Sequence, residues 1–173
     1  MNGYTFAIWL KLPSGATGTD YYLSSGGQHL HIDTGGMALM VQGQDQYLWL
    51  VFRMKPLNKV WRVNDYKPPR DEWFHLMVTW KQTADLYFYI DGTLVRKGLT
   101  NWTNGNSGGT TTMTIGKSNS HNAFGSASMD EWFVWDKYVT DAQVAGFYST
   151  YFDGKLLFFY TLGFLLLLVF KLA

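Results

Sequence analysis

Short runs of alternating apolar and polar residues, separated by Gly, Asn, Asp and Pro, fill the chain from about residue 4 to residue 139. In Tyr4–Leu12 the even-numbered residues from Phe6 onward are apolar and share one face of an extended strand, while the odd-numbered residues share the other. The same pattern predicts further strands at Tyr21–Ser24, His29–Asp33, Met37–Gln42, Tyr47–Met54, Lys59–Asn64, Trp73–Trp80, Leu86–Ile90, Thr93–Lys97, Met113–Gly116 and Met129–Trp135.

Only Asp141–Tyr148 has a helical pattern. Thr140 stands in the N-cap position with Gln143 three residues later, which is the spacing of a capping box. Thr100–Thr110 is polar and without periodicity, and we predict a loop there. Many short strands followed by one short helix predict an all-β fold, an antiparallel two-sheet β-sandwich of the jelly-roll kind, and not an α/β fold.

The end of the chain differs from the rest. Leu156–Phe170 is almost entirely apolar between Lys155 and Lys171. A helix of that length rises about 22 Å, which is short of the roughly 30 Å of a bilayer core. Three interpretations stay open: a transmembrane helix cut off at Ala173, intron sequence translated past an exon end, or a packed core helix. We therefore divide the chain into a sandwich domain at 1–152 and an apolar tail at 153–173.

Composition excludes several classes of function. The chain has 173 residues, enough for one domain with a sizeable core, and 18% of them are aromatic. Its formal net charge is +1 and its cationic residues are scattered, so no nucleic-acid partner is predicted. It has no cysteine, which excludes disulfides, thiolate metal sites and a cysteine nucleophile.

Three blocks of the sequence resemble the laminin-G-like and pentraxin family of concanavalin A-like jelly-roll domains. Tyr4–Pro13 is similar to the family's early strand, with an aromatic, alternating apolar residues, a Trp and a Lys-x-Pro exit. Asp71–Val95 resembles the central hairpin, with Trp-x-His and a strand ending in Asp-Gly, and Met113–Tyr148 resembles the closing strands and terminal helix. Only Met1–Gly3 precedes the first block, where family members normally have one or two more strands, and this suggests a missing N-terminal strand or an unpaired sheet edge.

The resemblance implies a structural role for the residues that define these blocks. Trp73 and His75 alternate with Phe74 and Leu76, so the two pairs point to opposite faces of a strand. Asp91 and Gly92 are expected to form a tight turn. The motif residues interpreted in this way are Trp9, Trp73, His75, Trp80, Asp91, Gly92, Asp130 and Trp135.

The family hosts lectins, adhesion modules and some hydrolases, so the fold does not decide the function. A glucan hydrolase needs two carboxylates on one strand face, about 5 Å apart. Asp130 and Glu131 are neighbours in the closing strand, and regular alternation predicts that they face opposite ways. We therefore expect no catalytic residues and no enzyme activity.

Both branches of the family often bind calcium at a rim of loops. Calcium prefers six to eight oxygen ligands, several of them carboxylates, and the loop before the closing strand has none. A single site using Asp20 or Asp33 with Asn119 or Asn122 stays open beside the interpretation that these are solvated turn residues. No other cofactor is predicted.

Asn101 begins an Asn-Trp-Thr glycosylation sequon in the predicted loop. We expect a non-enzymatic extracellular or cell-surface module that binds a glycan or an extracellular protein through its loop rim and is tethered to a membrane by its tail. The alternatives are a soluble lectin-like domain, a structural spacer in a larger membrane protein and, with least support, a glycan hydrolase relic. Aromatic rings that a ligand could contact are Tyr21, Tyr22, Tyr47, Trp49 and Trp61, although most rings in so aromatic a chain are core.

Overall fold

The computed structural model describes residues 3–15, 18–25, 36–42, 46–54, 59–81, 85–102, 112–118 and 123–152. The predicted strand at His29–Asp33 and the apolar tail at 153–173 lie outside these residues. Within the described part of the chain, no helix is both long enough and apolar enough to cross a membrane.

The described residues form strands throughout, with one helix after the last strand. The strands are β1 (Tyr4–Lys11), β2 (Asp20–Ser24), β3 (Gly36–Gln42), β4 (Tyr47–Met54), β5 (Lys59–Tyr66), β6 (Trp73–Trp80), β7 (Leu86–Ile90), β8 (Thr93–Trp102), β9 (Thr114–Ile115) and β10 (Ser128–Trp135), and the helix is α1 (Asp141–Phe152). The all-β prediction is confirmed, and most predicted strands agree with the observed ones within two residues.

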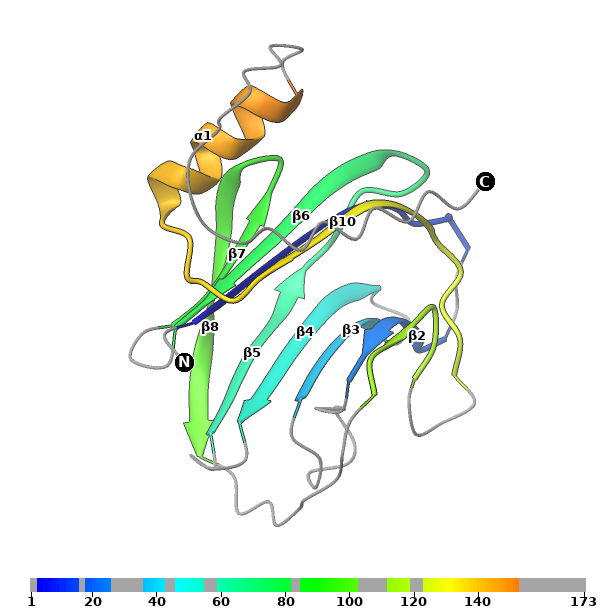
Figure 1. Cartoon of the computed structure of the whole chain (residues 1–173). Helices are drawn as coiled ribbons and strands as arrows, with labels where there is room; N and C mark the ends of the chain where they lie inside the picture. Colours follow the sequence, from blue (N-terminus) through cyan, green and yellow to red (C-terminus); the bar gives the residue numbers. More distant parts are fainter. Residues whose placement is uncertain are drawn as a thin grey trace.

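The strands form two antiparallel layers packed face to face (Figure 1). Sheet A has the order β10-β1-β6-β7-β8, and sheet B continues from β8 in the order β5-β4-β3-β2-β9. β1 is hydrogen-bonded on both sides, to β10 and to β6, so the first strand of the described chain is not a sheet edge. This is the two-sheet sandwich that the sequence predicts.

β8 passes from one layer to the other. Its first half pairs with β7 as far as Gly98, and its last residues pair with β5. A side chain at Gly98 would lie 2.9 Å from the Leu86 side chain and 3.1 Å from the Arg62 carbonyl oxygen, so the crossing needs a residue without a Cβ. The predicted loop at Thr100–Thr110 is therefore wrong at its start, because β5 supplies hydrogen-bonding partners to polar residues whose own pattern gives no strand signal.

The core lies between the sheets and is rich in aromatic rings. Trp61 and Trp80 are each 1% exposed, and their ring centroids are 5.2 Å apart in an edge-to-face arrangement. The Phe52 ring centroid lies 4.6 Å from that of Trp80, and the Tyr4 ring stacks on Trp80 with the centroids 6.0 Å apart. The even-numbered apolar residues of β1, Phe6, Ile8 and Leu10, face this core as predicted.

α1 covers part of the outer face of sheet A. Val144 packs with Ala7, Met77 and Tyr89 in a second buried cluster. The Thr140 amide donates to the Gln143 side-chain oxygen at 2.9 Å, which confirms the predicted capping interaction. The helix extends four residues beyond its predicted end at Tyr148.

The segment before α1 is fixed to β1 by a buried hydroxyl. Thr5 is fully buried, its Oγ1 donates to the Lys137 carbonyl at 2.7 Å, and it accepts from the Val139 amide at 3.1 Å. These bonds place α1 over one end of sheet A and not over the other.

Candidate functional site

The other end of the outer face of sheet A carries aromatic and charged side chains. Strand register places Trp9 opposite both His75 and Asp130, and places Lys11 opposite both Trp73 and Ser128. Residues that are directly opposite in a sheet project to the same face, so these side chains share one surface. We call the surface formed by Trp9, Lys11, Trp73, Asp130 and Glu131 the tryptophan patch.

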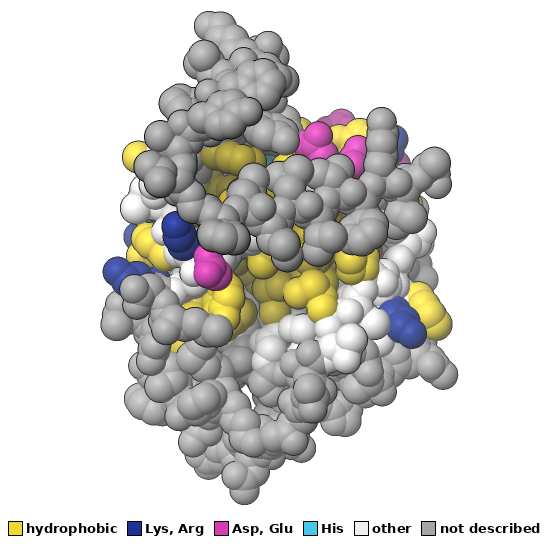
Figure 2. All heavy atoms as spheres, in the orientation of Figure 1, with side chains coloured by type: hydrophobic (Ala, Val, Ile, Leu, Met, Phe, Trp, Pro, Cys, Tyr) yellow, Lys and Arg dark blue, Asp and Glu magenta, His cyan; other side chains and the backbone are white. Residues whose placement is uncertain are grey.

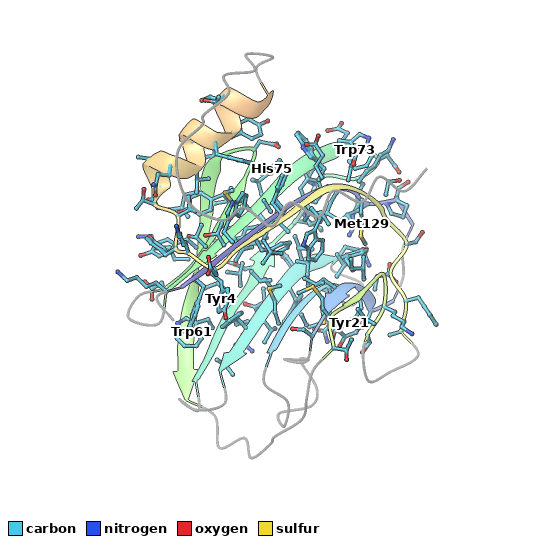
Figure 3. The ribbon with its side chains drawn as sticks, viewed as in Figure 1. Tyr4, Tyr21, Trp61, Trp73, His75 and Met129 are labelled. Atoms are coloured by element: carbon cyan, nitrogen blue, oxygen red, sulfur yellow. The ribbon has the colours of Figure 1, made fainter. Side chains whose placement is uncertain are left out.

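The tryptophan patch begins where the cover of α1 ends. Tyr148 and Phe147 of α1 lie over the His75 ring, with ring centroids 5.7 and 6.2 Å away, and His75 is 1% exposed. Trp73, two residues earlier on the same face of β6, is 46% exposed. Figure 3 labels Trp73 and His75 in the upper part of the view. Figure 2, in the same orientation, shows acidic side chains beside hydrophobic ones in the upper part of the molecule.

His75 lies beside the patch, on the same outer face, and packs against Trp9. Trp9 packs on its ring at 5.3 Å, and burial lowers the pKa of His75 to about 4, so the ring is neutral at physiological pH. The Asp91 carboxylate accepts the His75 backbone amide at 2.8 Å, and the Asp91 amide donates to the His75 carbonyl at 2.9 Å. Asp91 and Gly92 have φ angles of 48° and 73°, so they form the two-residue turn with left-handed backbone that joins β7 to β8.

The prediction that Asp130 and Glu131 face opposite ways is wrong. Ala7 of β1 pairs with Phe133 of β10, and the next pair is Trp9 with Asp130. Between these pairs β1 advances by two residues and β10 by three, so β10 contains one extra residue, which is a β-bulge. Glu131 sits in this bulge with a φ of 48°, so the regular alternation is broken. Both carboxylates therefore lie beside Trp9.

The local hydrogen bonds show how the bulge holds the two carboxylates. Asp130 accepts the backbone amide of Glu131 at 2.8 Å, and the indole N–H of Trp9 donates to the Glu131 carboxylate. Burial raises the pKa of Glu131, and the neighbouring negative charge of Asp130 raises it further, whereas the Trp9 hydrogen bond lowers it by less. The sequence carries a signal that would have revealed the bulge: Met129 and Trp132, three residues apart, both pack against the core.

The loop rim next to the patch is ordered by several contacts. The Asp71 amide donates to the Leu12 carbonyl at 2.8 Å, and the Asp71 carboxylate accepts the Ser14 amide at 3.1 Å. Arg70 reaches the Pro13 carbonyl and the Gln46 side chain, with the latter at 2.8 Å. These bonds tie together the segments that precede β2, β4 and β6.

The calcium candidates are only partly within the described residues. Asp20 begins β2, where burial raises the pKa of its carboxyl and the charge of Arg70 opposes that rise. Asp33, Asn119 and Asn122 lie outside the described residues. Within those residues no group of three or more His, Asp or Glu side chains could hold a metal ion. The positive charge of Arg70 near Asp20 also disfavours a cation at Asp20 itself, and the other three candidates of the predicted site stay a prediction.

The remaining candidate residues divide between core and surface. Asn101 lies in β8 opposite Val60, not in a loop, and the structure describes only its backbone. Tyr21, Tyr22 and Trp61 are buried. On sheet B, Arg62 lies over the Trp49 ring at 5.6 Å, and Lys67 lies over the Tyr47 ring at 5.8 Å, so basic side chains of the chain itself occupy these rings. Trp80 is a core residue, and Trp135 packs against Phe147 under α1.

Comparison with known proteins places this architecture among recognised families. A family model described as the concanavalin A-like lectin/glucanases superfamily matches residues 1–145. The comparison with curated proteins gives no match.

Several solved structures share the fold. Domain 4 of an extracellular GH43 arabinanase from Geobacillus stearothermophilus, solved with arabinotriose, is 22% identical over 84% of this chain and 66% of that chain, with a TM-score of 0.55. The receptor binding domain of botulinum neurotoxin D is 11% identical over 87% of this chain and 38% of that chain, with a TM-score of 0.65. The binding domain of Paraclostridial Mosquitocidal Protein 1 is 16% identical over 88% and 38% of the two chains, with a TM-score of 0.63. The chain thus spans little more than a third of the toxin fragments, and at these identities the likeness concerns the fold alone.

Proposed function

The chain belongs to the concanavalin A-like lectin/glucanase superfamily, and from that premise we propose that it is a non-enzymatic extracellular recognition domain. Its ligand is a glycan or an extracellular protein, and it binds at the loop rim and the adjoining tryptophan patch. Structural neighbours described as binding domains, one of them a botulinum neurotoxin binding domain in complex with SialylT, support this class of function.

The observation that carries the proposal is the exposure of Trp73 beside an ordered rim. A tryptophan that is 46% exposed leaves a large apolar ring in water, which is the residue type most often found at the centre of binding interfaces. The hydrogen bonds of Asp71 and Arg70 hold the neighbouring loop segments in place before any ligand arrives. Such pre-organisation lowers the entropy cost of binding.

The two carboxylates of the bulge support recognition and not hydrolysis. Asp130 is engaged by the amide of Glu131, and Glu131 is engaged by the indole of Trp9. A retaining or inverting glycosidase needs one carboxylate as nucleophile or base and a second as acid, on either side of the scissile bond. Asp130 and Glu131 are consecutive residues of one bulge and both lie beside Trp9, so they are not placed on two sides of a bound sugar, and we expect no turnover of glycans.

An extracellular or cell-surface location follows from the proposed ligand class, and the Asn101 sequon is consistent with it. A membrane tether would be supplied by the apolar segment at 153–173. A spacer domain without a ligand is the alternative that the experiment below separates. A soluble lectin-like domain differs from the proposal only in having no tether.

The test is to present the chain to a glycan microarray and to extracellular matrix proteins, with and without calcium. We expect binding that Trp73→Ala weakens by about thirtyfold or more, because an anchoring tryptophan contributes about 2 kcal/mol or more at an interface. The matched control is Phe124→Ala, which removes an exposed ring at the edge of sheet B. Binding that both variants weaken equally, or steady release of reducing sugar, would contradict the proposal, and absence of any ligand would favour the spacer.

A further inference from the structure

The carboxylates of Asp130 and Glu131 are adjacent and have no counter-ion within the described part of the chain. The one ion pair among described residues joins Arg96 to Asp65, on other strands. Burial and the Asp130 charge both act against ionisation of Glu131, so the pair is held together at an electrostatic cost. A cation placed beside the pair would offset the repulsion between the two negative charges.

The one basic side chain in the tryptophan patch, Lys11, lies opposite Trp73 in the strand register and acts on another carboxylate. Hydrogen bonds with Ser14 lower the pKa of the Asp71 carboxyl, and the positive charges of Lys11 and Arg70 lower it further. Glu72, next to Trp73, is exposed and adds a further negative charge. The patch thus keeps an excess of negative charge on a chain whose formal net charge is +1.

The Trp73 ring is also open to a cation, since 46% of this residue is exposed. Elsewhere on the described surface, Arg62 lies over Trp49 and Lys97 lies over Tyr87, at 5.6 and 5.4 Å from the ring centroids. No described basic side chain lies over Trp73, although it is more exposed than most rings of the molecule. A basic group over a tryptophan ring is attracted by the negative face of the ring, most strongly where water is excluded.

From these observations, and resting on the proposed recognition function, we infer that the tryptophan patch binds a basic segment of a partner protein, with an arginine side chain between the Trp73 ring and the carboxylates of Asp130 and Glu131. A guanidinium is planar and can stack on an indole while its N–H groups pair with a carboxylate, which matches the flat and open shape of a sheet face. A neutral saccharide could also stack on the Trp73 ring and donate hydroxyl hydrogen bonds to the carboxylates, but it carries no charge that offsets their two negative charges. Charge complementarity therefore favours the basic peptide.

The probe is a blocked Gly-Arg-Gly-Arg-Gly peptide, compared with the same peptide containing citrulline, which keeps the shape and loses the charge. Binding is followed by NMR from the indole N–H signals of the intact chain, at low and at physiological ionic strength. We expect the arginine peptide to shift the Trp73 and Trp9 signals, with weaker binding at higher salt because exposed charges are screened. The citrulline peptide should bind at least about fivefold more weakly.

Two charge-removing variants test the carboxylates without dismantling the bulge. Asp130→Asn keeps an oxygen for the Glu131 amide, and Glu131→Gln keeps an oxygen for the Trp9 indole. Each should weaken the arginine peptide by about threefold to fivefold, while the matched control Asp65→Asn, which removes the same charge elsewhere, leaves it unchanged. Unchanged signals from the core tryptophans, Trp61 and Trp80, show that each variant is folded.

The inference is overturned if the two peptides bind equally, if the double variant Asp130→Asn/Glu131→Gln binds as tightly as the parent chain, or if no peptide shifts the Trp73 signal. A glycan that shifts the Trp73 signal when the arginine peptide does not would also overturn it. That outcome would leave the proposed recognition function intact. Failure of the recognition function itself would appear separately, as the absence of any ligand on the glycan and matrix-protein panels.

Discussion

The contact between Asp91 and His75 gives a sharp test of how the β7–β8 turn stabilises the sandwich. The Asp91 carboxylate accepts the backbone amide of His75 at 2.8 Å, and His75 is 1% exposed. Replacing Asp91 with alanine removes that acceptor and leaves the amide in a place where water is largely excluded. Asp91→Asn keeps an oxygen in the same position.

The expected loss has two parts. An unsatisfied buried amide costs about 1–3 kcal/mol. Asp91 has a φ of 48°, and alanine in this left-handed region costs roughly 1 kcal/mol more than aspartate or asparagine, whose side chains tolerate it. We therefore expect Asp91→Ala to lower the free energy of unfolding by about 2–4 kcal/mol, which corresponds to a fall of roughly 5–12 °C in Tm for a domain of this size.

Urea and thermal unfolding of the parent chain and both variants measure this difference. Asp91→Asn should stay within about 0.5 kcal/mol of the parent, because an Asn-Gly pair also suits a two-residue turn with left-handed backbone. If Asp91→Ala were as stable as the parent, the hydrogen bond would contribute nothing. If Asp91→Asn lost as much as Asp91→Ala, the negative charge and not the hydrogen bond would be the source of stability.

Three further predictions concern other contacts. Burial lowers the pKa of His75 from 6.5 to about 4, so the folded state favours the neutral ring. This contributes about 3 kcal/mol to the free energy of unfolding, which is present above pH 6.5 and lost as the pH falls toward 4, and His75→Phe should flatten that part of a stability–pH curve. Thr5→Val should cost about 2 kcal/mol in urea unfolding, because it removes both hydrogen bonds to the segment before α1, while Thr5→Ser should cost less than half as much. Gly125→Ala should cost about 2 kcal/mol or prevent folding, because the added carbon overlaps the Tyr21 backbone; a melting curve like that of the parent would contradict this.

Strand alternation explains why the sandwich could be predicted. In β1 and β6 every second side chain enters one core, so burial and pattern agree. Trp73 and His75 fall on the outer face as predicted, but alternation could not show that α1 covers one and leaves the other exposed. That distinction depends on Tyr148, which comes from an element more than seventy residues away in the sequence.

Local deviations from regular strand geometry account for the errors. The bulge at Glu131 adds one residue to β10, and a pattern with a period of two cannot represent an added residue. The end of β8 differs from the prediction for another reason: Thr100 and Asn101 are polar, and their strand conformation comes from pairing with β5 and not from their own preference.

The bulge also explains how Asp130 and Glu131 can serve both stability and the proposed recognition. If β10 were regular, Glu131 would point toward the core, where an ionised carboxylate without a partner is costly. The added residue places Glu131 on the outer face, where the Trp9 indole satisfies one oxygen and the charge stays at the surface. Stability then depends on the oxygens as hydrogen-bond acceptors, and binding of a cation depends on their charge. Glu131→Gln separates the two, because it keeps the first property and removes the second. A melting temperature that is unchanged or higher, since the repulsion from Asp130 is removed, together with weakened binding is the combination that this account requires.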